Sequence, residues 1–195
     1  MTYRTFLALP LAEAFQHEIS NFLYRLRKKN GGIKWVLPEQ VHITLHFFGP
    51  TTGDQILEIK KRMQSVASTY HPLRLALSEM GFFPDASRPR VIWIGMTGDT
   101  ARLIEIQSSI EKDLAAAGFE IEDRRFRPHA TLGRVRPHQG RPPIRGENFK
   151  DVFFVPTSLK TIDRIVLFQS ILSSSGSRYE VLETFPFSGL ASSSS

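Results

Sequence analysis

Residues 41–49 read VHITLHFFG and residues 126–134 read FRPHATLGR, so the pattern His-x-Thr-Leu occurs twice. It begins at His42 and again at His129, 87 positions later (129 − 42). In the first copy, apolar and polar residues alternate with a period of two, which is typical of a strand with one buried face. This alternation predicts one row facing the core (Val41, Ile43, Leu45, Phe47) and one row facing an accessible surface (His42, Thr44, His46, Phe48). The second copy presents His129 and Thr131 in the same way.

Two imidazoles and two hydroxyls on accessible strand faces suit a phosphodiester substrate. Because histidine titrates near neutral pH, one ring can take a proton from water while the other gives one to a leaving ribose oxygen. The hydroxyls of Thr44 and Thr131 can hydrogen-bond the non-bridging phosphate oxygens. Arg127 and Arg134, which flank the second copy, can neutralise the developing charge. This chemistry requires neither a metal nor an organic cofactor.

Two other interpretations of these histidines compete with catalysis. A single histidine on a strand is more often a structural residue than a catalyst, but a duplicated motif with arginines beside it favours catalysis. His42 and His46 also have the i, i+4 spacing of two zinc ligands on a helix. On a strand, residues four apart are separated by about 13 Å, too far to share one ion. The sequence therefore predicts no metal site.

Composition and charge narrow the class of protein. The net charge is +6, and residues 124–145 contain seven arginines and no acid, as expected for a surface that meets phosphates. The absence of cysteine excludes disulfides and thiolate chemistry. No apolar run reaches the roughly 20 residues of a membrane helix. The first ten residues lack the apolar length of a signal peptide, so we expect a cytoplasmic protein without membrane association.

Strand and helix patterns are mixed along the chain without regular alternation, which favours an α+β fold with antiparallel sheets. Residues 1–187 are expected to form one domain, residues 136–146 a mobile loop rich in Pro, Gly and Arg, and residues 188–195 a disordered tail. Strands are predicted at 3–9, 41–48, 73–80, 90–96, 127–132, 161–169 and 178–185, and helices at 11–29, 52–68 and 100–117.

The sequence resembles the two-histidine phosphoesterase superfamily, and within it the bacterial and archaeal RNA 2′,3′-cyclic phosphodiesterases, also called 2′-5′ RNA ligases. The paired motifs carry the resemblance to the superfamily. Flanking segments that point to this branch are 6–10 (FLALP), 34–36 (KWV), 81–84 (GFFP), 90–95 (RVIWIG) and 179–182 (YEVL).

The resemblance implies a bilobal, pseudo-symmetric duplication, in which two antiparallel sheets line a central cleft and the helices lie outside. It implies hydrolysis of 2′,3′-cyclic phosphate RNA ends to 2′-phosphates, with reversible 2′-5′ joining of tRNA halves reported for some members. His42 would be the acid and His129 the base, although the symmetric motif leaves the opposite assignment open.

Further site residues follow from the same resemblance. Thr44 and Thr131 would bind phosphate, with Arg134 beside them. Phe48, Phe82 and Phe83 are candidates for stacking on a base, with core packing as the alternative for each. We expect the partner to be RNA with a 2′,3′-cyclic phosphate end, tRNA fragments included, and the protein to be a monomer.

Two other functions compete with RNA-end hydrolysis. One is a non-catalytic module that captures phosphorylated RNA ends. The other keeps the chemistry and changes the substrate to a small cyclic nucleotide or a 2′-5′-linked oligonucleotide. His46 would be an additional titratable group on the accessible face of the first strand.

Overall fold

A computed structural model describes residues 1–29, 32–136, 144–152, 154–173 and 176–188 of the chain. The loop expected at 136–146 lies mostly outside these residues, as does nearly all of the tail expected at 188–195. No helix within the described residues is long and apolar enough to cross a membrane.

Strands and helices follow one another along the chain without a regular alternation, and the α+β prediction is confirmed. The elements are β1 (Thr2–Pro10), α1 (Ala12–Lys29), β2 (Ile33–Trp35), η1 (Pro38–Gln40), β3 (His42–Thr52), α2 (Gly53–Ser68), β4 (Leu73–Phe83), β5 (Val91–Gly98), α3 (Thr100–Ala116), β6 (His129–Val135), η2 (Gly146–Phe149), β7 (Lys160–Ile162), β8 (Arg164–Ser173) and β9 (Gly176–Pro186). The predicted helices and strands occur with ends that differ by a few residues, except that the single strand predicted at 161–169 is divided between β7, which pairs with β4, and β8, which pairs with β1 and β9. The largest differences are at the ends of β3, β4, β6 and β8, which extend three to four residues further than predicted.

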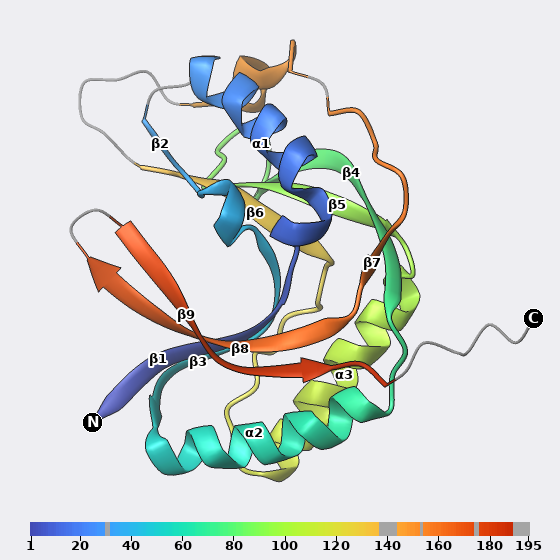
Figure 1. Cartoon of the computed structure of the whole chain (residues 1–195). Coiled ribbons are helices and arrows are strands. Elements are labelled where there is room, and N and C mark those ends of the chain that lie inside the picture. The colour runs from blue at the N-terminus through green and yellow to red at the C-terminus, as the bar shows by residue number, and fades with distance from the viewer. Residues whose placement is uncertain (30–31, 137–143, 153, 174–175, 189–195) are drawn as a thin grey trace, which may run out of the picture.

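All strands belong to one antiparallel sheet in the order β7-β4-β5-β6-β3-β1-β8-β9, with β2 pairing on β6. The prediction of two separate sheets is therefore wrong. The two halves join because Ile43 of β3 pairs with Ala130 of β6, at the centre of the two repeated motifs. The joined sheet curls strongly into a half-barrel (Figure 1).

Helices cover one side of this curled sheet. In Figure 1, α2 and α3 lie along the half that contains β1, β3, β8 and β9, and α1 lies over the other half. Helix α2 begins at a capping box, in which the Thr52 side chain accepts from the Gln55 backbone N–H and the Gln55 side chain accepts from the Thr52 N–H. Its buried face includes Ile59 and Met63, and Lys60 forms a salt bridge with Glu183 of β9 at 3.1 Å.

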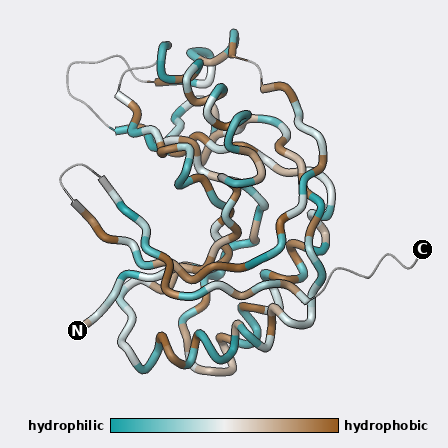
Figure 2. The backbone as a smooth tube through the Cα atoms, in the orientation of Figure 1, coloured by the Kyte–Doolittle hydropathy of each residue, from teal (hydrophilic) through white to brown (hydrophobic). Residues whose placement is uncertain are grey.

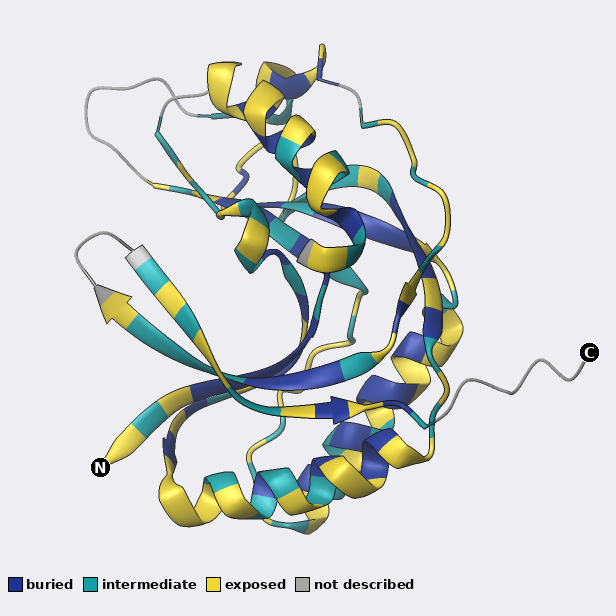
Figure 3. Cartoon of the chain, viewed as in Figure 1, coloured by how far each residue is buried: buried dark blue, intermediate teal, exposed yellow. Residues whose placement is uncertain are grey.

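The apolar core lies between the sheet and the helices. The central strands are the most hydrophobic and most buried segments of the chain (Figures 2 and 3). Ile43 and Ala130 are both fully buried and face this core. We call the opposite, concave face of the sheet the inner face. Because side chains alternate along a strand, the neighbours of Ile43 and Ala130 emerge on the inner face.

A β-bulge interrupts β3 immediately after its motif threonine. Leu7 of β1 lies opposite His46, and Ala8 lies opposite Thr44, so Leu45 has no partner on β1. A bulge inserts one extra residue and changes the face to which the following side chains point.

The same irregularity occurs in β6. Ile92 of β5 lies opposite Gly133, and Trp93 lies opposite Thr131, so Leu132 is the unpaired residue. Leu45 and Leu132 both follow the motif threonine directly and are both buried. Each motif therefore ends in a bulge whose leucine packs into the core.

These bulges overturn part of the predicted alternation. His46 turns to the core side, where it is 5% exposed and its ring lies 4.5 Å from that of Phe48. The prediction that His46 shares the face of His42 is therefore wrong, and Phe47 occupies the inner face instead, opposite Phe6. In β6, the bulge brings Arg134 to the inner face, opposite Val91.

Candidate active site

The two repeated motifs meet at the centre of the inner face. Ile43 and Ala130 are paired in antiparallel register. Extending this register by one residue in each direction places His42 opposite Thr131 and Thr44 opposite His129. Both histidines and Thr131 are half-buried, and Thr44 is exposed.

This register makes the two histidines diagonal neighbours on adjacent strands. Cβ atoms of diagonal neighbours in an antiparallel pair are about 7–8 Å apart, and directly opposite Cβ atoms about 5 Å. His129 acts electrostatically on His42, as expected for rings at that separation. A phosphate group placed between the rings would also lie beside both threonine hydroxyls. The predicted residues His42, Thr44, His129 and Thr131 are thus brought together.

Both imidazole rings are held in the same way. Nδ1 of His42 lies 2.6 Å from the Gln40 carbonyl, and Nδ1 of His129 lies 2.6 Å from the Arg127 carbonyl. A carbonyl oxygen can only accept, so each Nδ1 carries the hydrogen. In the neutral ring Nε2 is then the unprotonated nitrogen, available to accept a proton or, once protonated, to donate one.

Burial lowers the pKa of both rings. It lowers the pKa of His42 to about 4, against the opposing effect of its hydrogen bond to Gln40, with Arg134 and His129 adding to the decrease. Burial also lowers the pKa of His129, opposed by its hydrogen bond to Arg127 and assisted by Arg134 and Arg124. Both rings are therefore neutral near pH 7, in a site whose nearest fixed charges are positive.

Aromatic rings surround His42. The Phe6 ring centre lies 4.9 Å from that of His42, and the Tyr179 ring meets His42 edge-on at 5.4 Å. Phe168 stacks on Phe6 at 5.3 Å. Burial raises the pKa of Tyr179, which keeps its hydroxyl protonated as a possible donor. These rings come from β1, β8 and β9, so the aromatic surroundings of His42 are formed by strands that are far apart in the sequence.

A second aromatic group surrounds His129. The Phe83 ring is perpendicular to the His129 ring at 4.9 Å and contacts the Trp93 ring in a tilted arrangement at 5.2 Å. A Cβ atom added at Gly81 would lie 2.1 Å from the Trp93 ring, and one at Gly95 would lie 3.4 Å from it. The missing side chain at Gly81 therefore leaves the space that the Trp93 indole occupies, and Trp93 in turn contacts Phe83, which lies against His129.

Other predicted residues lie elsewhere. Phe48 packs against His46 and Phe119 on the core side of β3, so it is not on the inner face. Phe82 contacts Phe149 and lines a separate hollow with Arg145. Neither ring is therefore near the histidines, whereas Phe83 is.

Two further expectations concern Arg127 and metal ligands. The carbonyl of Arg127 orients His129, and its side chain is exposed. His42 and His46 point to opposite faces of β3. No group of three or more His, Cys, Asp or Glu residues that could hold a metal ion occurs among the described residues.

Sequence reasoning missed Phe6, Tyr179 and Trp93 as neighbours of the site. All three lie in segments that the resemblance to the family included. Phe6 and Trp93 are aromatic residues within apolar strands. In a sequence, such a residue is as typical of the core as of a binding site. Only the pairing of β1, β5 and β9 with the rest of the sheet shows that these rings face inward.

The chain is similar to known proteins over nearly its whole length. A family model described as LigT like Phosphoesterase matches twice, over residues 9–93 and 94–179, which indicates an internal duplication. The RNA 2′,3′-cyclic phosphodiesterase of Thermotoga maritima is 30% identical over 187 residues, covering 95% of this chain and 96% of the relative. That of Methanocaldococcus jannaschii is 34% identical over 182 residues, covering 92% and 98%. The crystal structure of TT0787 from Thermus thermophilus superposes with a TM-score of 0.73 at 27% identity, covering 94% and 97%.

Proposed function

Because the chain belongs to the LigT-like phosphoesterase family, we propose that it hydrolyses 2′,3′-cyclic phosphate ends of RNA to 2′-phosphate ends. The observation that carries this proposal is the register of β3 and β6, which brings two histidine–threonine pairs from distant parts of the chain to one point. The relatives from Thermotoga maritima and Methanocaldococcus jannaschii are named RNA 2′,3′-cyclic phosphodiesterases.

The proposed reaction needs one proton acceptor and one proton donor. Nε2 of one histidine takes a proton from water as the water oxygen bonds to phosphorus. The P–O3′ bond breaks, and Nε2 of the other histidine protonates O3′, which leaves a 2′-phosphate and a 3′-hydroxyl. After one turnover, one histidine has gained a proton and the other has lost one. Proton exchange with solvent restores both rings to their starting states. Two such contributions are each worth about 10² to 10⁴ in rate.

The remaining residues act on the phosphate oxygens. Thr44 and Thr131 donate hydrogen bonds to the non-bridging oxygens and hold phosphorus in line with the attacking water. Arg134, whose charge acts on both histidines, stabilises the transition state. A bound phosphate diester also carries a negative charge, which favours a protonated histidine and supplies the acid.

The assignment of acid and base follows the family pattern, with His42 as the acid and His129 as the base. Both rings present Nε2 in the same way, so this assignment rests on the resemblance. Phe83, beside His129, is the one predicted stacking residue on the inner face, and we assign it to the base of the terminal nucleotide. The same chemistry run with an RNA 5′-hydroxyl in place of water gives 2′-5′ joining.

The test is hydrolysis of a short RNA that ends in a 2′,3′-cyclic phosphate, with the phosphate position of the product read by NMR. We expect a 2′-phosphate product and a loss of at least about 100-fold in kcat/KM for both His42→Ala and His129→Ala. His17→Ala, which removes an exposed histidine of α1, is the matched control.

Near-normal turnover in either active-site variant would overturn the proposal. Tight RNA binding by the wild-type protein without product between pH 5 and 9 would instead support the non-catalytic end-binding module.

A further inference from the structure

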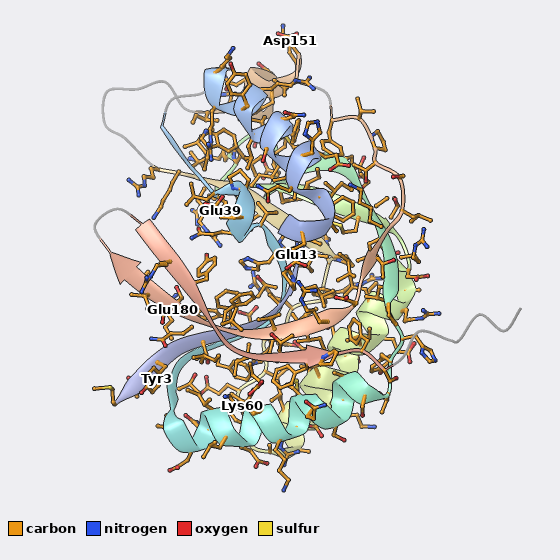
Figure 4. The ribbon with its side chains drawn as sticks, viewed as in Figure 1. Tyr3, Glu13, Glu39, Lys60, Asp151 and Glu180 are labelled. Carbon is orange, nitrogen blue, oxygen red and sulfur yellow. The ribbon has the colours of Figure 1, made fainter. Side chains whose placement is uncertain are left out.

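The buried face of α3 carries one polar side chain, Gln107, among the residues that the structure describes there. The buried residues of this helix are Leu103, Ile106, Gln107, Ile110 and Leu114. Gln107 is only 5% exposed. Side chains fill the layer between the sheet and its helices, where Lys60 of α2 reaches towards β9 (Figure 4). Because an amide in such a layer destabilises the fold unless it is hydrogen-bonded, Gln107 requires a specific partner.

The partner of Gln107 is the backbone of the first bulge. Its Nε2 donates a hydrogen bond to the carbonyl of Leu45 at 3.4 Å. Burial raises the pKa of Glu111, one turn further along α3, and a hydrogen bond from Gln107 opposes that rise. A carbonyl and a carboxylate both accept hydrogen bonds, so the NH2 group of the amide serves both of them. These two acceptors determine which way the Gln107 amide points.

The second bulge has an equivalent hydrogen bond from a different source. The Leu132 carbonyl accepts from the backbone N–H of Val36 at 2.8 Å, directly after the end of β2. Strand β2 is thus a third neighbour of β6, whereas β3 pairs only with β6 and β1 in the described sheet. A neighbouring strand therefore supports the second bulge, and one side chain from α3 supports the first.

Thr44 is the motif residue whose place depends most directly on the first bulge. The ring of His42 has its own anchor in the Gln40 carbonyl. The Thr44 side chain has no hydrogen-bond partner among the described residues. Its position is set by the backbone on either side of it, which pairs with Ala8 and continues into the bulge at Leu45.

We propose that Gln107 is a positioning residue for the phosphate-binding hydroxyl of Thr44. The Gln107 amide holds the Leu45 carbonyl and so fixes the bulge, and the fixed bulge keeps Thr44 opposite His129. Gln107 does not touch the substrate, because α3 lies on the helix-covered side of the sheet (Figure 1). This inference rests on the proposed hydrolysis of cyclic-phosphate RNA ends.

The first test uses variants that remove the amide or shorten its reach. Gln107→Met keeps the length of the side chain and loses the donor, and Gln107→Asn keeps the donor but is one methylene too short. Each should lower kcat/KM for a cyclic-phosphate RNA about tenfold, the effect of one hydrogen bond. Gln64→Met makes the same exchange at an exposed position of α2 and should leave kcat/KM unchanged. Unchanged kcat/KM in both Gln107 variants would overturn the proposal.

The second test separates positioning of Thr44 from a general loss of stability. Gln107→Met is combined with Thr44→Val and, separately, with Thr131→Val. If Gln107 acts through the Thr44 hydroxyl, its loss should cost less than about twofold when that hydroxyl is already missing, and still about tenfold in the Thr131→Val background. Equal losses in the two backgrounds would contradict the proposal, because Gln107 would then serve only the fold.

A third measurement, by NMR, does not depend on activity. In the wild type, the side-chain NH2 hydrogens of Gln107 should exchange with solvent more slowly than those of Gln64. Gln107→Met should shift the backbone amide resonances of Leu45 and His46 and leave that of Leu132 in place. Fast exchange at Gln107, or unshifted Leu45 and His46 amides, would refute the contact even if activity falls. Failure of the wild-type protein to hydrolyse the RNA would instead refute the proposed function, and these resonances would still report on Gln107.

Discussion

Leu45 and Leu132 are the unpaired residues of two β-bulges at matching positions in the two halves of the chain. Each leucine packs into the core, and each bulge changes the face reached by the side chains that follow it. The fourth residue of the His-x-Thr-Leu pattern is therefore structural. The bulge at Leu132 brings Arg134 to the inner face beside Thr131. The bulge at Leu45 turns His46 to the core side of the sheet, where it is buried.

The depressed histidine pKa values predict an acidic optimum for kcat/KM. The free protein needs one neutral and one protonated ring. Because burial lowers the pKa of His42 to about 4 and also lowers the pKa of His129, the singly protonated form becomes more populated as the pH falls below the usual histidine range. kcat/KM should rise as the pH falls below 6.5 and decline again when both rings are protonated.

The same reasoning separates kcat/KM from kcat. In the complex, the bound phosphate favours the protonated ring, so the kcat optimum should lie at higher pH than that of kcat/KM. Steady-state rates on a cyclic-phosphate substrate across pH 4 to 9 measure both profiles. A kcat/KM maximum above pH 7.5 would contradict the burial of the two rings.

Replacement of Gly81 by alanine should weaken catalysis from a distance. A Cβ atom there would lie 2.1 Å from the Trp93 ring, which must then shift and carry Phe83 away from His129. We expect a loss of stability of about 1–3 kcal/mol and a lower kcat. Gly53→Ala, where no atom lies within 4 Å of the new Cβ, is the control. Equal kcat in Gly81→Ala and the wild type would show that the contacts from Trp93 through Phe83 do not position His129.

The elements of this fold could be predicted from the sequence because they depend on local patterns. The alternation before Thr44 identifies a strand, and the Gly118 stop after α3 has the left-handed backbone expected there, with φ of 82°. The position of His42 and Thr44 on the same face of β3 also follows from that local periodicity. These features require no knowledge of the neighbouring strands.

The rest of the site depends on strand pairing, which a single chain segment does not encode. The bulge at Leu45 is defined only against β1, so the alternation could not show that His46 turns inward. Phe6 and Tyr179 reach His42 from β1 and β9, at opposite ends of the sequence. The single pair Ile43 and Ala130, which joins the expected two sheets into one, is likewise a property of the assembled fold.

The two threonines should contribute comparably to catalysis. Thr44 and Thr131 lie opposite His129 and His42 by the register of the central pair. Thr44→Val and Thr131→Val each remove one hydroxyl and keep the side-chain shape. Loss of a hydrogen bond to a charged phosphate should lower kcat/KM by about 10- to 100-fold in each variant. A loss confined to one threonine would mean that the phosphate does not sit between the two motifs.

His46 should limit stability at acidic pH without taking part in the reaction. Its buried Nε2 has no hydrogen-bond partner among the described residues, and burial lowers its pKa, with Glu122 opposing that decrease. Below pH 6.5 the unfolded chain therefore binds a proton that the folded protein does not, and stability is lost as the pH falls. His46→Leu should remove this loss and, at pH 5, raise the free energy of unfolding by about 1 kcal/mol.

Urea denaturation at pH 8 and pH 5 measures this effect. The exposed His17→Gln variant is the control for removal of a histidine. Greater acid sensitivity in His46→Leu than in the wild type would show that the buried ring is a stabilising partner.

The claim that both histidines act on one phosphorus is tested most directly by a double-variant cycle. kcat/KM for a cyclic-phosphate RNA is measured for the wild type, His42→Ala, His129→Ala and the combined variant. Residues that act as one unit are strongly non-additive, so the double variant should be about as active as the weaker single variant. Losses that multiply in the double variant would show that the two rings act independently, and the shared site would be wrong.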